Sequence, residues 1–357
     1  MSTKFYPLTI AAIEPETSDC VSMVLEVPKN LQSVFKFQPG QNLIFRIFQN
    51  GIEHRRNYSI CSGVNDNEWR VAVKKIPNGI FTNYIHHLAK AGESIEVLPP
   101  TGHFTIPALP DQPVHLLAIA AGSGITPILS MIKSTLQNYP KAKFTLIYGN
   151  SFRHSIIFRE QLENLKNQYI DRLTIHYLLS REKMSSELHT GRISPEKLEQ
   201  FKGKLIHYDH IQHVFVCGPA ELIFSTKEYF LNQGLSNKQI HFELFNAPTA
   251  PVHTQQQSSA SGDQKMSQVE VKVDGIQFSF PLAQEGISLL DAALAEGANL
   301  PFACKGGVCS TCKAKLTKGT VRMDQNYALE EDEVEQGYIL SCQSHPTSDC
   351  VSVDFDH

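Results

Sequence analysis

Four cysteines near the C-terminal end constrain the fold more than any other feature, because their spacing decides what they can bind together. Their pattern is C-x4-C-x2-C, followed after a long gap by a fourth cysteine. This is the ligand spacing of a plant-type [2Fe–2S] cluster. Gly306 and Gly307 lie inside the first interval, where they let the backbone turn tightly and approach the inorganic sulfides. The predicted cluster ligands are Cys304, Cys309, Cys312 and Cys342.

Two other uses of cysteine fit this pattern less well. A structural zinc site usually combines C-x2-C with a second close pair, and the chain has no second pair. A disulfide framework is typical of small secreted domains, whereas this chain has 357 residues and begins without an apolar secretory segment. Eight cysteines in such a chain are typical of a reducing compartment, so we expect a cytoplasmic protein.

Length and charge indicate several domains with different surfaces. A chain of this length is long enough for two or three domains. Residues 267–357 hold 6 Lys/Arg and 14 Asp/Glu, although the formal net charge of the whole chain is only −4. An acidic domain beside a mildly basic remainder suits electrostatic docking with a redox partner, and it equally suits a well-solvated small domain. Neither part has the basic stripe of a nucleic-acid binder, so no nucleic-acid partner is expected.

Residues 1–107 are predicted to form an antiparallel β-barrel, because short β-rich runs alternate there with turn residues. One helix interrupts the runs at about Thr82–Lys90. The β-rich runs are Tyr6–Ile13, Val21–Val27, Asn42–Phe48, Asn57–Cys61, Trp69–Lys75 and Ser94–Leu98.

Residues 108–247 alternate between strands and helices, which predicts an α/β domain with a doubly wound parallel sheet. Its most apolar part, Val114–Ile132, has the hydropathy of a short membrane span. Glycines and a proline interrupt it, so we interpret it as strand, turn and helix and expect no membrane insertion. The predicted strands are His115–Ala121, Lys143–Tyr148, Leu173–Leu179, His213–Cys217 and Gln239–Leu244. The predicted helices are Pro127–Asn138, Ser155–Gln168, Pro195–Phe201 and Ala220–Gln233.

The rest of the chain divides into a linker and a third domain. Residues 248–266 are polar and rich in Gln and Ser, which predicts an unordered linker. Residues 267–357 are predicted to form a separate α+β domain. It begins with a hairpin, Ser267–Phe280, around the turn signal Asp274-Gly275. A short helix, Leu289–Glu296, then leads to the cysteines.

The run Arg56–Ser59 lies on a predicted barrel strand, and alternation places Arg56 and Tyr58 on the same face. A cation there can pair with a cofactor diphosphate and an aromatic ring can stack on a flat ring. The same pattern also occurs on ordinary exposed strand faces. Further along, Thr82 or Asn83 is predicted to cap a helix whose N-terminal amides can hold phosphate.

The run Gly122–Pro127 follows a predicted strand and opens a predicted helix. Its glycines let a pyrophosphate approach the backbone, Thr126 is predicted to be the N-cap, and Pro127 suits the first helical turn. The run departs from G-x-G-x-x-G in ending with proline, and a glycine turn can also serve tight packing alone. The prediction of a nucleotide site therefore depends on the strand–turn–helix context.

Over essentially its whole length the chain resembles the ferredoxin–NADP⁺ reductase superfamily. The matching runs are Arg56–Ser59, Gly122–Pro127, Cys217-Gly218-Pro219 and Glu243-Leu244-Phe245, in the order flavin domain, nucleotide domain, C-terminal β-grasp ferredoxin. Within the superfamily the chain is most similar to the reductase subunits of ring 1,2-phenylacetyl-CoA epoxidases. The runs that carry this similarity are Leu117–Pro127, Ile147–Asn150, Cys304–Cys312, Leu340–Gln343 and Val353–Asp356.

The resemblance implies a role for each matching residue. Arg56 would pair with the FAD diphosphate, Tyr58 would stack on the isoalloxazine, and Ser59 would hydrogen-bond near flavin N5. Val73 and Lys74 would line the flavin, and Thr82 would hold its phosphate.

The resemblance also implies the residues that bind the nicotinamide nucleotide. Gly122, Gly124 and Thr126 would bind its pyrophosphate. Cys217 would lie near the nicotinamide, although an inert buried thiol is the alternative, and Glu243 and Phe245 would lie close to the flavin. The cofactor-binding set also includes Asn57, Gly79, Pro127, Asn150, Gly218 and Pro219.

The choice between NADPH and NADH depends on two residues. After the strand Leu173–Leu179 come Ser180 and Arg181, which resemble the Ser-Arg pair that grips a 2′-phosphate in plant-type reductases. No Asp or Glu directly follows the strand Lys143–Tyr148 to bind a ribose 2′-hydroxyl. An arginine after a strand is usually only a solvated charge, yet together these features favour NADPH over NADH.

The resemblance implies an oxidoreductase that passes electrons from NADPH through FAD and the cluster to an oxygenase. The acceptor would be the di-iron oxygenase subunits that epoxidise the ring of phenylacetyl-CoA in aerobic phenylacetate catabolism. No residue of this chain suggests a CoA or aromatic substrate site, so the ring chemistry would occur on those partner subunits. Two alternatives stay open: the reductase of another aromatic-ring or alkane oxygenase, and a redox-sensing interaction protein.

Overall fold

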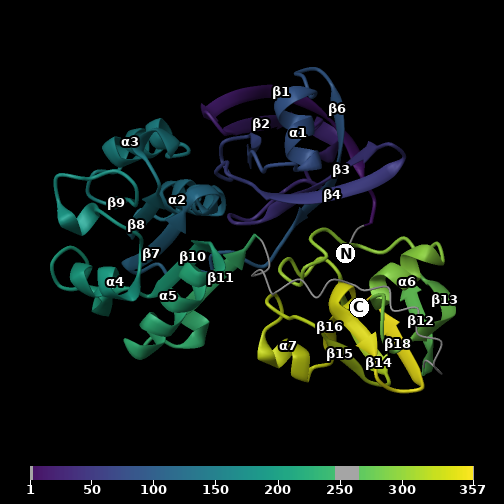
Figure 1. Ribbon diagram of the computed structural model, residues 1–357. Coiled ribbons are helices and arrows are strands. Elements are labelled where there is room, and N and C mark those ends of the chain that lie inside the picture. Colours follow the sequence, from purple (N-terminus) through teal and green to yellow (C-terminus); the bar gives the residue numbers. More distant parts are fainter. Residues whose placement is uncertain (1–2, 246–264, 357) are drawn as a thin grey trace. The chain divides into compact units, whose positions relative to one another are not determined.

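The chain is described by a computed structural model that covers residues 3–245 and 265–356. The predicted linker 248–266 therefore lies outside the described residues, except for its last two positions. Contacts divide the chain into two compact units, Phe5–Leu244 and a smaller one formed by Met1–Lys4 and Phe245–His357. Figure 1 shows the larger unit in purple to teal-green, with two sheets, and the smaller unit in green to yellow.

The first sheet of the larger unit is an antiparallel barrel, as predicted. Its six strands follow the order β4-β3-β6-β1-β2-β5. A bridge between Ile60 and Val71 joins the end of β4 to β5 and closes the sheet. Asn50 and Gly51, both at positive φ, make the two-residue turn between β3 and β4. The strands are β1 (Tyr6–Thr17), β2 (Cys20–Glu26), β3 (Asn42–Gln49), β4 (Ile52–Ser59), β5 (Trp69–Lys74) and β6 (Ser94–Thr101), and α1 spans Ile80–His87.

The second sheet of the larger unit is parallel and doubly wound, which confirms the predicted fold class. Its strand order is β11-β10-β7-β8-β9, so the order in which strands are added reverses between the parallel strands β7 and β10. Ligands of such sheets bind outside the carboxyl ends of the strands at this reversal. The strands are β7 (Val114–Ala121), β8 (Ala142–Asn150), β9 (Leu173–Leu179), β10 (His213–Gly218) and β11 (Ile240–Leu244). The helices are α2 (Ile125–Asn138), α3 (Arg159–Gln168), α4 (Pro195–Phe201) and α5 (Ala220–Asn232).

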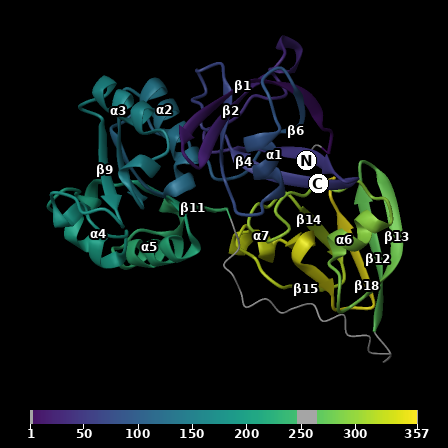
Figure 2. The same cartoon turned by 45° about the horizontal axis from the view of Figure 1, so that its top comes forward.

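The smaller unit contains a mixed sheet with the short helix α6 (Leu289–Ala295) packed against it, as a β-grasp domain requires (Figure 2). The predicted hairpin forms around Asp274 and Gly275, both at positive φ, and β12 also pairs in parallel with β18. The sheet order is β13-β12-β18-β14-β16. Its strands are β12 (Met266–Val273), β13 (Ile276–Ala283), β14 (Lys313–Lys318), β16 (Tyr338–Leu340) and β18 (Cys350–Asp354). The remaining elements are α6 (Leu289–Ala295), β15 (Val321–Met323), α7 (Glu331–Glu335) and β17 (Ser344–Pro346).

Several predicted helix starts were wrong. The helix predicted from Ser155 begins at Arg159, because Phe158 adopts a left-handed conformation with φ of 58°. The helix α1 begins before Thr82, so its N-cap is Gly79 and neither Thr82 nor Asn83 caps it. The helix α2 likewise begins at Ile125 with Gly124 as N-cap, which places Thr126 inside the first turn.

The predicted strand–turn–helix interpretation of the most apolar stretch is confirmed. Val114–Ala121 is β7, a short 3-10 turn follows at Gly122–Gly124, and α2 begins next. In the part of the chain that the structure covers, no helix is both long and apolar enough to span a membrane.

Candidate functional site

The predicted nucleotide loop lies at the reversal point of the parallel sheet, directly after β7. Gly122 has φ of 54° and open space where a side chain would stand, so a ligand can approach its backbone. Gly124 is required for a different reason, since a Cβ there would lie 2.1 Å from the carbonyl oxygen of Cys217. The hydroxyl of Thr126 is buried and donates to the Ser123 carbonyl at 3.0 Å, so it stabilises the turn.

Tyr148 stabilises this loop from the neighbouring strand β8, and no sequence motif singled it out. Its side chain on β8 is fully buried, and its hydroxyl donates to the carbonyl of Gly122 at 2.9 Å. Burial raises the pKa of Tyr148, so the phenol stays neutral and keeps the proton that it donates. Only the run Ile147–Asn150 in the resemblance could have pointed to it.

The end of β10 forms the other wall of the reversal point. Cys217 is fully buried, and burial followed by the nearby Glu243 carboxyl raises its pKa. The thiol is therefore neutral, which supports a packing or positioning role and argues against a nucleophile. A Cβ at Gly218 would meet side chains of Ala121 and Leu222 at 3.1 Å, and Pro219 precedes α5 as its N-cap.

A carboxyl group from β11 meets the predicted flavin strand. Ser59 Oγ donates to Glu243 Oε2 at 3.1 Å, although the two residues lie 184 positions apart. Asn42, which was not predicted, also hydrogen-bonds Glu243, and both Asn42 and Ser59 are buried. Burial raises the pKa of Glu243 to about 8 against the opposing effect of these two hydrogen bonds. The carboxyl is therefore mostly neutral at pH 7.

The other residues of the predicted flavin strand are packed on an aromatic ring, exposed to solvent or half-buried. Tyr58 packs on the ring of Phe81, with centroids 5.2 Å apart and planes 30° apart. Arg56 is exposed, and its guanidinium donates to the carbonyl of Arg55 at 2.6 Å. Asn57 on the same strand is half-buried. An exposed cation and an oriented aromatic ring on one strand fit a flavin nucleotide with a diphosphate.

Three further predicted flavin contacts have their side chains engaged elsewhere. Val73 is fully buried in the barrel core, so only its backbone can face a ligand. Lys74 lies 3.4 Å from Asp19 in an ion pair. Thr82 is buried and its hydroxyl lies 3.1 Å from the carbonyl of Gly79, within the turn that starts α1. A phosphate in this region would therefore meet backbone amides at the start of α1.

The residues predicted to choose between NADPH and NADH lie at the carboxyl edge of the parallel sheet. The backbone amides of Ser180 and Arg181 donate to the carbonyls of Asn150 and Ser151, each at 2.9 Å. Both side chains are exposed, while Asn150 is buried. Within the described residues the guanidinium of Arg181 has no ion pair, so it is available to an anionic ligand.

Phe245, also predicted near the flavin, directly follows β11 and groups with the smaller unit. Its position at the flavin stays a prediction.

The cysteine loop of the smaller unit directs backbone amides at sulfur. Gly306 N donates to Cys304 Sγ at 3.3 Å. A hydrogen bond from Cys309 and the amides of Gly306 and Val308 lower the pKa of Cys304 to about 6. Gly307 has φ of 74°, and a Cβ there would lie 3.0 Å from the carbonyl oxygen of Gln325. A tight loop with amide donors facing a thiolate is the environment that an iron–sulfur cluster requires.

The four cysteines form two pairs. The thiol of Cys309 donates to Cys304, and the thiol of Cys312 donates to Cys342. In the described parts of the chain, no three or more metal-binding side chains converge on a single ion. Two pairs of thiols suit two irons, each held by two cysteines, better than one tetrahedral zinc.

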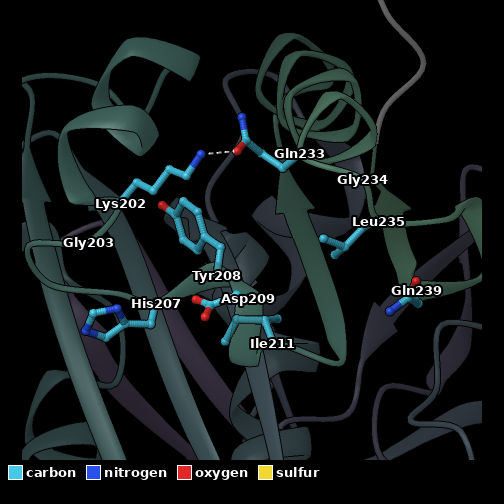
Figure 3. A pocket seen from close by; sticks show the side chains of 10 residues that line it. All are labelled: Lys202, Gly203, His207, Tyr208, Asp209, Ile211, Gln233, Gly234, Leu235 and Gln239. Atoms are coloured by element: carbon cyan, nitrogen blue, oxygen red, sulfur yellow. Dashed lines mark hydrogen bonds between the residues drawn. The ribbon is translucent and has the colours of Figure 1, made fainter.

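A cavity of about 540 Å³ lies at the opposite, amino-terminal edge of the parallel sheet (Figure 3). None of the predicted nucleotide or flavin residues lines it. It lies next to the starts of β10 and β11. Its lining residues are Lys202, Gly203, His207, Tyr208, Asp209, Ile211, Gln233, Gly234, Leu235 and Gln239.

Comparison with known protein families assigns a domain to each of three parts of the chain. The oxidoreductase FAD-binding domain matches residues 7–106, and the oxidoreductase NAD-binding domain matches residues 118–228. The 2Fe-2S iron-sulfur cluster binding domain matches residues 271–347.

Relatives of known role are similar over nearly the full length. The chain is 42% identical to a subunit of the 1,2-phenylacetyl-CoA epoxidase of Escherichia coli strain K12, across 99% of this chain and 98% of that protein. It is 32% identical to the ferredoxin reductase component of 3-ketosteroid-9-alpha-monooxygenase of Rhodococcus rhodochrous, across 98% and 96%. Among solved structures, phthalate dioxygenase reductase shares the fold with a TM-score of 0.61 and 24% identity, covering 98% of both chains.

These matches cover all three domains, and the named relatives are reductase components or subunits of oxygenases. The chain belongs to the family of modular ferredoxin reductases with FAD-binding, NAD-binding and [2Fe–2S] domains, and it is an NAD(P)H-dependent oxidoreductase of the kind that forms the reductase component of multicomponent oxygenases.

Proposed function

We propose that this chain is the NADPH-dependent reductase of an oxygenase that epoxidises the aromatic ring of phenylacetyl-CoA. The observation that carries the proposal is the 42% identity to the Escherichia coli epoxidase protein across 99% of the chain. The partners would be the oxygenase subunits that hold the di-iron centre. When bound, FAD accepts two electrons as a hydride, and the cluster passes electrons on singly.

The larger unit would hold both organic cofactors. The exposed guanidinium of Arg56 would pair with the FAD diphosphate, and Tyr58 and Asn57 would contact the flavin. The backbone of Gly122–Gly124 and the N-terminal amides of α2 would bind the nucleotide pyrophosphate. Ser180 and Arg181 would bind a 2′-phosphate, which is the basis for proposing NADPH.

Ser59 and Glu243 would orient the reacting rings without adding charge. With a pKa of about 8, the Glu243 carboxyl is mostly neutral at pH 7 and places no negative charge beside a ring that gains electrons. The hydrogen bond from Ser59 fixes the position of the carboxyl. Buried Cys217 would shape the nicotinamide pocket as a neutral thiol.

The smaller unit would hold the cluster between its two thiol pairs. Cys304 and Cys309 would bind one iron, and Cys312 and Cys342 the other. The amide of Gly306 would stabilise the charge on sulfur, which raises the reduction potential of a cluster.

The test is reconstitution with purified di-iron oxygenase subunits and phenylacetyl-CoA. NADPH consumption coupled to epoxide formation would support the proposal. NADPH consumption that reduces a dye but never supports epoxidation would point to a different oxygenase. A redox sensor, the other alternative, would show no sustained NADPH turnover even with an artificial acceptor.

A further inference from the structure

The helix α2 has a polar face that is bonded to one loop of the barrel. The loop, residues 62–66, follows the predicted flavin strand β4 after Ile60 and Cys61. The helix side chains that meet it recur at the three- and four-residue spacing of a single face. They are Ser130, Lys133, Ser134, Gln137 and Asn138. We call this set of contacts the clasp.

The first contact of the clasp is fully buried, and the second is partly buried. Ser130 Oγ donates to the carbonyl of Ser62 at 2.6 Å, and both residues are fully buried. The backbone amide of Val64 donates to Ser134 Oγ at 3.1 Å. Buried polar groups without water are costly to separate from their partners, so these bonds hold the loop at one height along the helix.

An ion pair continues the clasp toward the surface. Lys133 Nζ lies 2.8 Å from Asp66 Oδ2, with side-chain exposures of only 14% and 19%. The amide of Gly63 donates to the same oxygen at 2.9 Å. Burial alone would raise the pKa of Asp66, but the hydrogen bonds from Lys133 and Gly63 lower it, so Asp66 is a carboxylate.

The loop backbone also approaches the helix closely. A Cβ at Gly63 would lie 3.0 Å from the Cβ of Lys133. The base of the loop is tied to the barrel, because the amide of Arg70 donates to Ser62 Oγ at 2.8 Å. The loop is therefore bonded to the barrel as well as to the helix.

Each side of the clasp leads within a few residues to a predicted cofactor site. On the barrel side, Ser62 is three residues after Ser59, which hydrogen-bonds Glu243. On the other side, Ser130 is five residues into the helix that begins directly after Gly122–Gly124, a distance of about 7.5 Å along the axis. Both paths are therefore short enough to transmit a displacement of the clasp to the site.

We propose that the clasp sets the position of the nucleotide loop relative to the flavin strand, so that Ser130, Lys133 and Asp66 are positioning residues for hydride transfer. This inference rests on the proposed reduction of FAD by NADPH. Hydride transfer needs the donor carbon of the nicotinamide and the acceptor nitrogen of the flavin in near contact, and a displacement of about 1 Å can cost about 100-fold in rate. An ordinary stabilising contact would instead lower thermal stability without affecting this step selectively.

The experiment uses the full-length protein loaded with FAD and its cluster. In single-turnover mixing with saturating NADPH, Lys133→Met and Ser130→Ala should each slow flavin reduction by about tenfold. The dissociation constant for NADPH should stay within about twofold, because the loop that binds it is intact. Lys133→Arg keeps the ion pair and should recover most of the rate. The matched control is Lys141→Met, which removes the exposed ion pair between Lys141 and Asp111 (3.1 Å) away from the clasp.

Two results would overturn the clasp proposal. One is an unchanged reduction rate in both Lys133→Met and Ser130→Ala. The other is slower flavin reduction that is accounted for by loss of FAD or of thermal stability. Equally slow flavin reduction in Lys141→Met would have the same meaning. If Lys133→Met does not fold, Asp66→Asn replaces it, since the amide oxygen still accepts from Gly63. Failure of the proposed function gives a different result. In that case NADPH does not reduce the flavin even in the wild-type protein.

Discussion

At the scale of single residues, the functional assignments depend on groups that are far apart in sequence. Asn42, Ser59 and Glu243 meet at one point, and none of them lies near another along the chain. Burial raises the pKa of the Glu243 carboxyl to about 8, although the hydrogen bonds from Asn42 and Ser59 oppose this change. Perturbed carboxyl groups of this kind concentrate at functional sites.

Glu243→Gln should change the pH dependence of both stability and catalysis. Between the ordinary value of 4.5 and about 8 the folded protein binds this proton more tightly than the unfolded chain does. Wild-type stability should therefore fall as pH rises through that window, while the variant lacks this contribution. The melting temperature of the variant relative to wild type should rise by roughly 10 °C between pH 5 and pH 9. A difference in melting temperature between the variant and wild type that does not change with pH would contradict the raised pKa of Glu243.

The same variant should lose a pH dependence of flavin reduction. In wild type the rate should decline as Glu243 ionises with a pKa near 8, because a negative charge then lies beside the rings. Single-turnover rates from about pH 6 to about pH 9.5 measure this. A decline near pH 8 that persists in Glu243→Gln would assign the titration to another group.

Tyr148→Phe should weaken NADPH binding by about fivefold, which corresponds to the loss of one hydrogen bond of about 1 kcal/mol. The reason is that its hydroxyl holds the carbonyl of Gly122 at 2.9 Å. Tyr208→Phe is a matched control, since its hydroxyl also donates to a backbone carbonyl, that of Leu198, at 2.9 Å. Equal affinities for NADPH in Tyr148→Phe and wild type, measured by equilibrium titration, would exclude this role.

At the scale of elements, local sequence signals determine which strands and turns form, and tertiary contacts determine where the helices begin. The Asp274-Gly275 hairpin and the strand Leu173–Leu179 were predicted correctly, because turn residues and apolar runs act locally. The predicted starts of α1 and α2 were wrong. Glycines are the N-caps of both helices, and the two threonines lie inside the first helical turn. Helix ends depend on packing that a single sequence pattern does not contain.

The loop after β9 should select between nucleotides. Replacing Ser180 and Arg181 with alanine should weaken NADPH by about tenfold or more and leave NADH nearly unchanged, because only NADPH carries the 2′-phosphate. Lys183→Ala is a suitable control, since it removes an exposed cation two residues further along. Steady-state kcat/KM for both nucleotides measures the effect. An unchanged ratio would remove the basis for proposing NADPH.

At the scale of the whole molecule, the two units separate the chemistry of hydride transfer from that of single-electron transfer. The residues proposed to bind FAD and NADPH lie in Phe5–Leu244, apart from Phe245, and all four cluster cysteines lie in the other unit. Each unit has its own buried core. The organisation matches a reductase in which the last carrier is a distinct domain.

A chain that ends at residue 246 should therefore retain NADPH-dependent dye reduction and lose electron transfer to the oxygenase. Its rate of dye reduction should stay within about twofold of the full-length protein if the larger unit folds alone. The measurement is oxygenase-coupled product formation beside dye reduction in the same preparation. Efficient transfer to the oxygenase by the shortened chain would place the cluster outside the electron path.

The sequence by itself determined the domain order, the two sheet types and the cluster-ligand prediction, because periodicity, turn residues and cysteine spacing are local properties of the chain. Only the tertiary structure decided which side chains share an environment. It brought Glu243 to Ser59, placed Tyr148 beneath Gly122 and bonded α2 to the loop after β4. These contacts join residues distant in sequence, and burial then sets their protonation and their hydrogen bonds. That information exists only once the chain has folded.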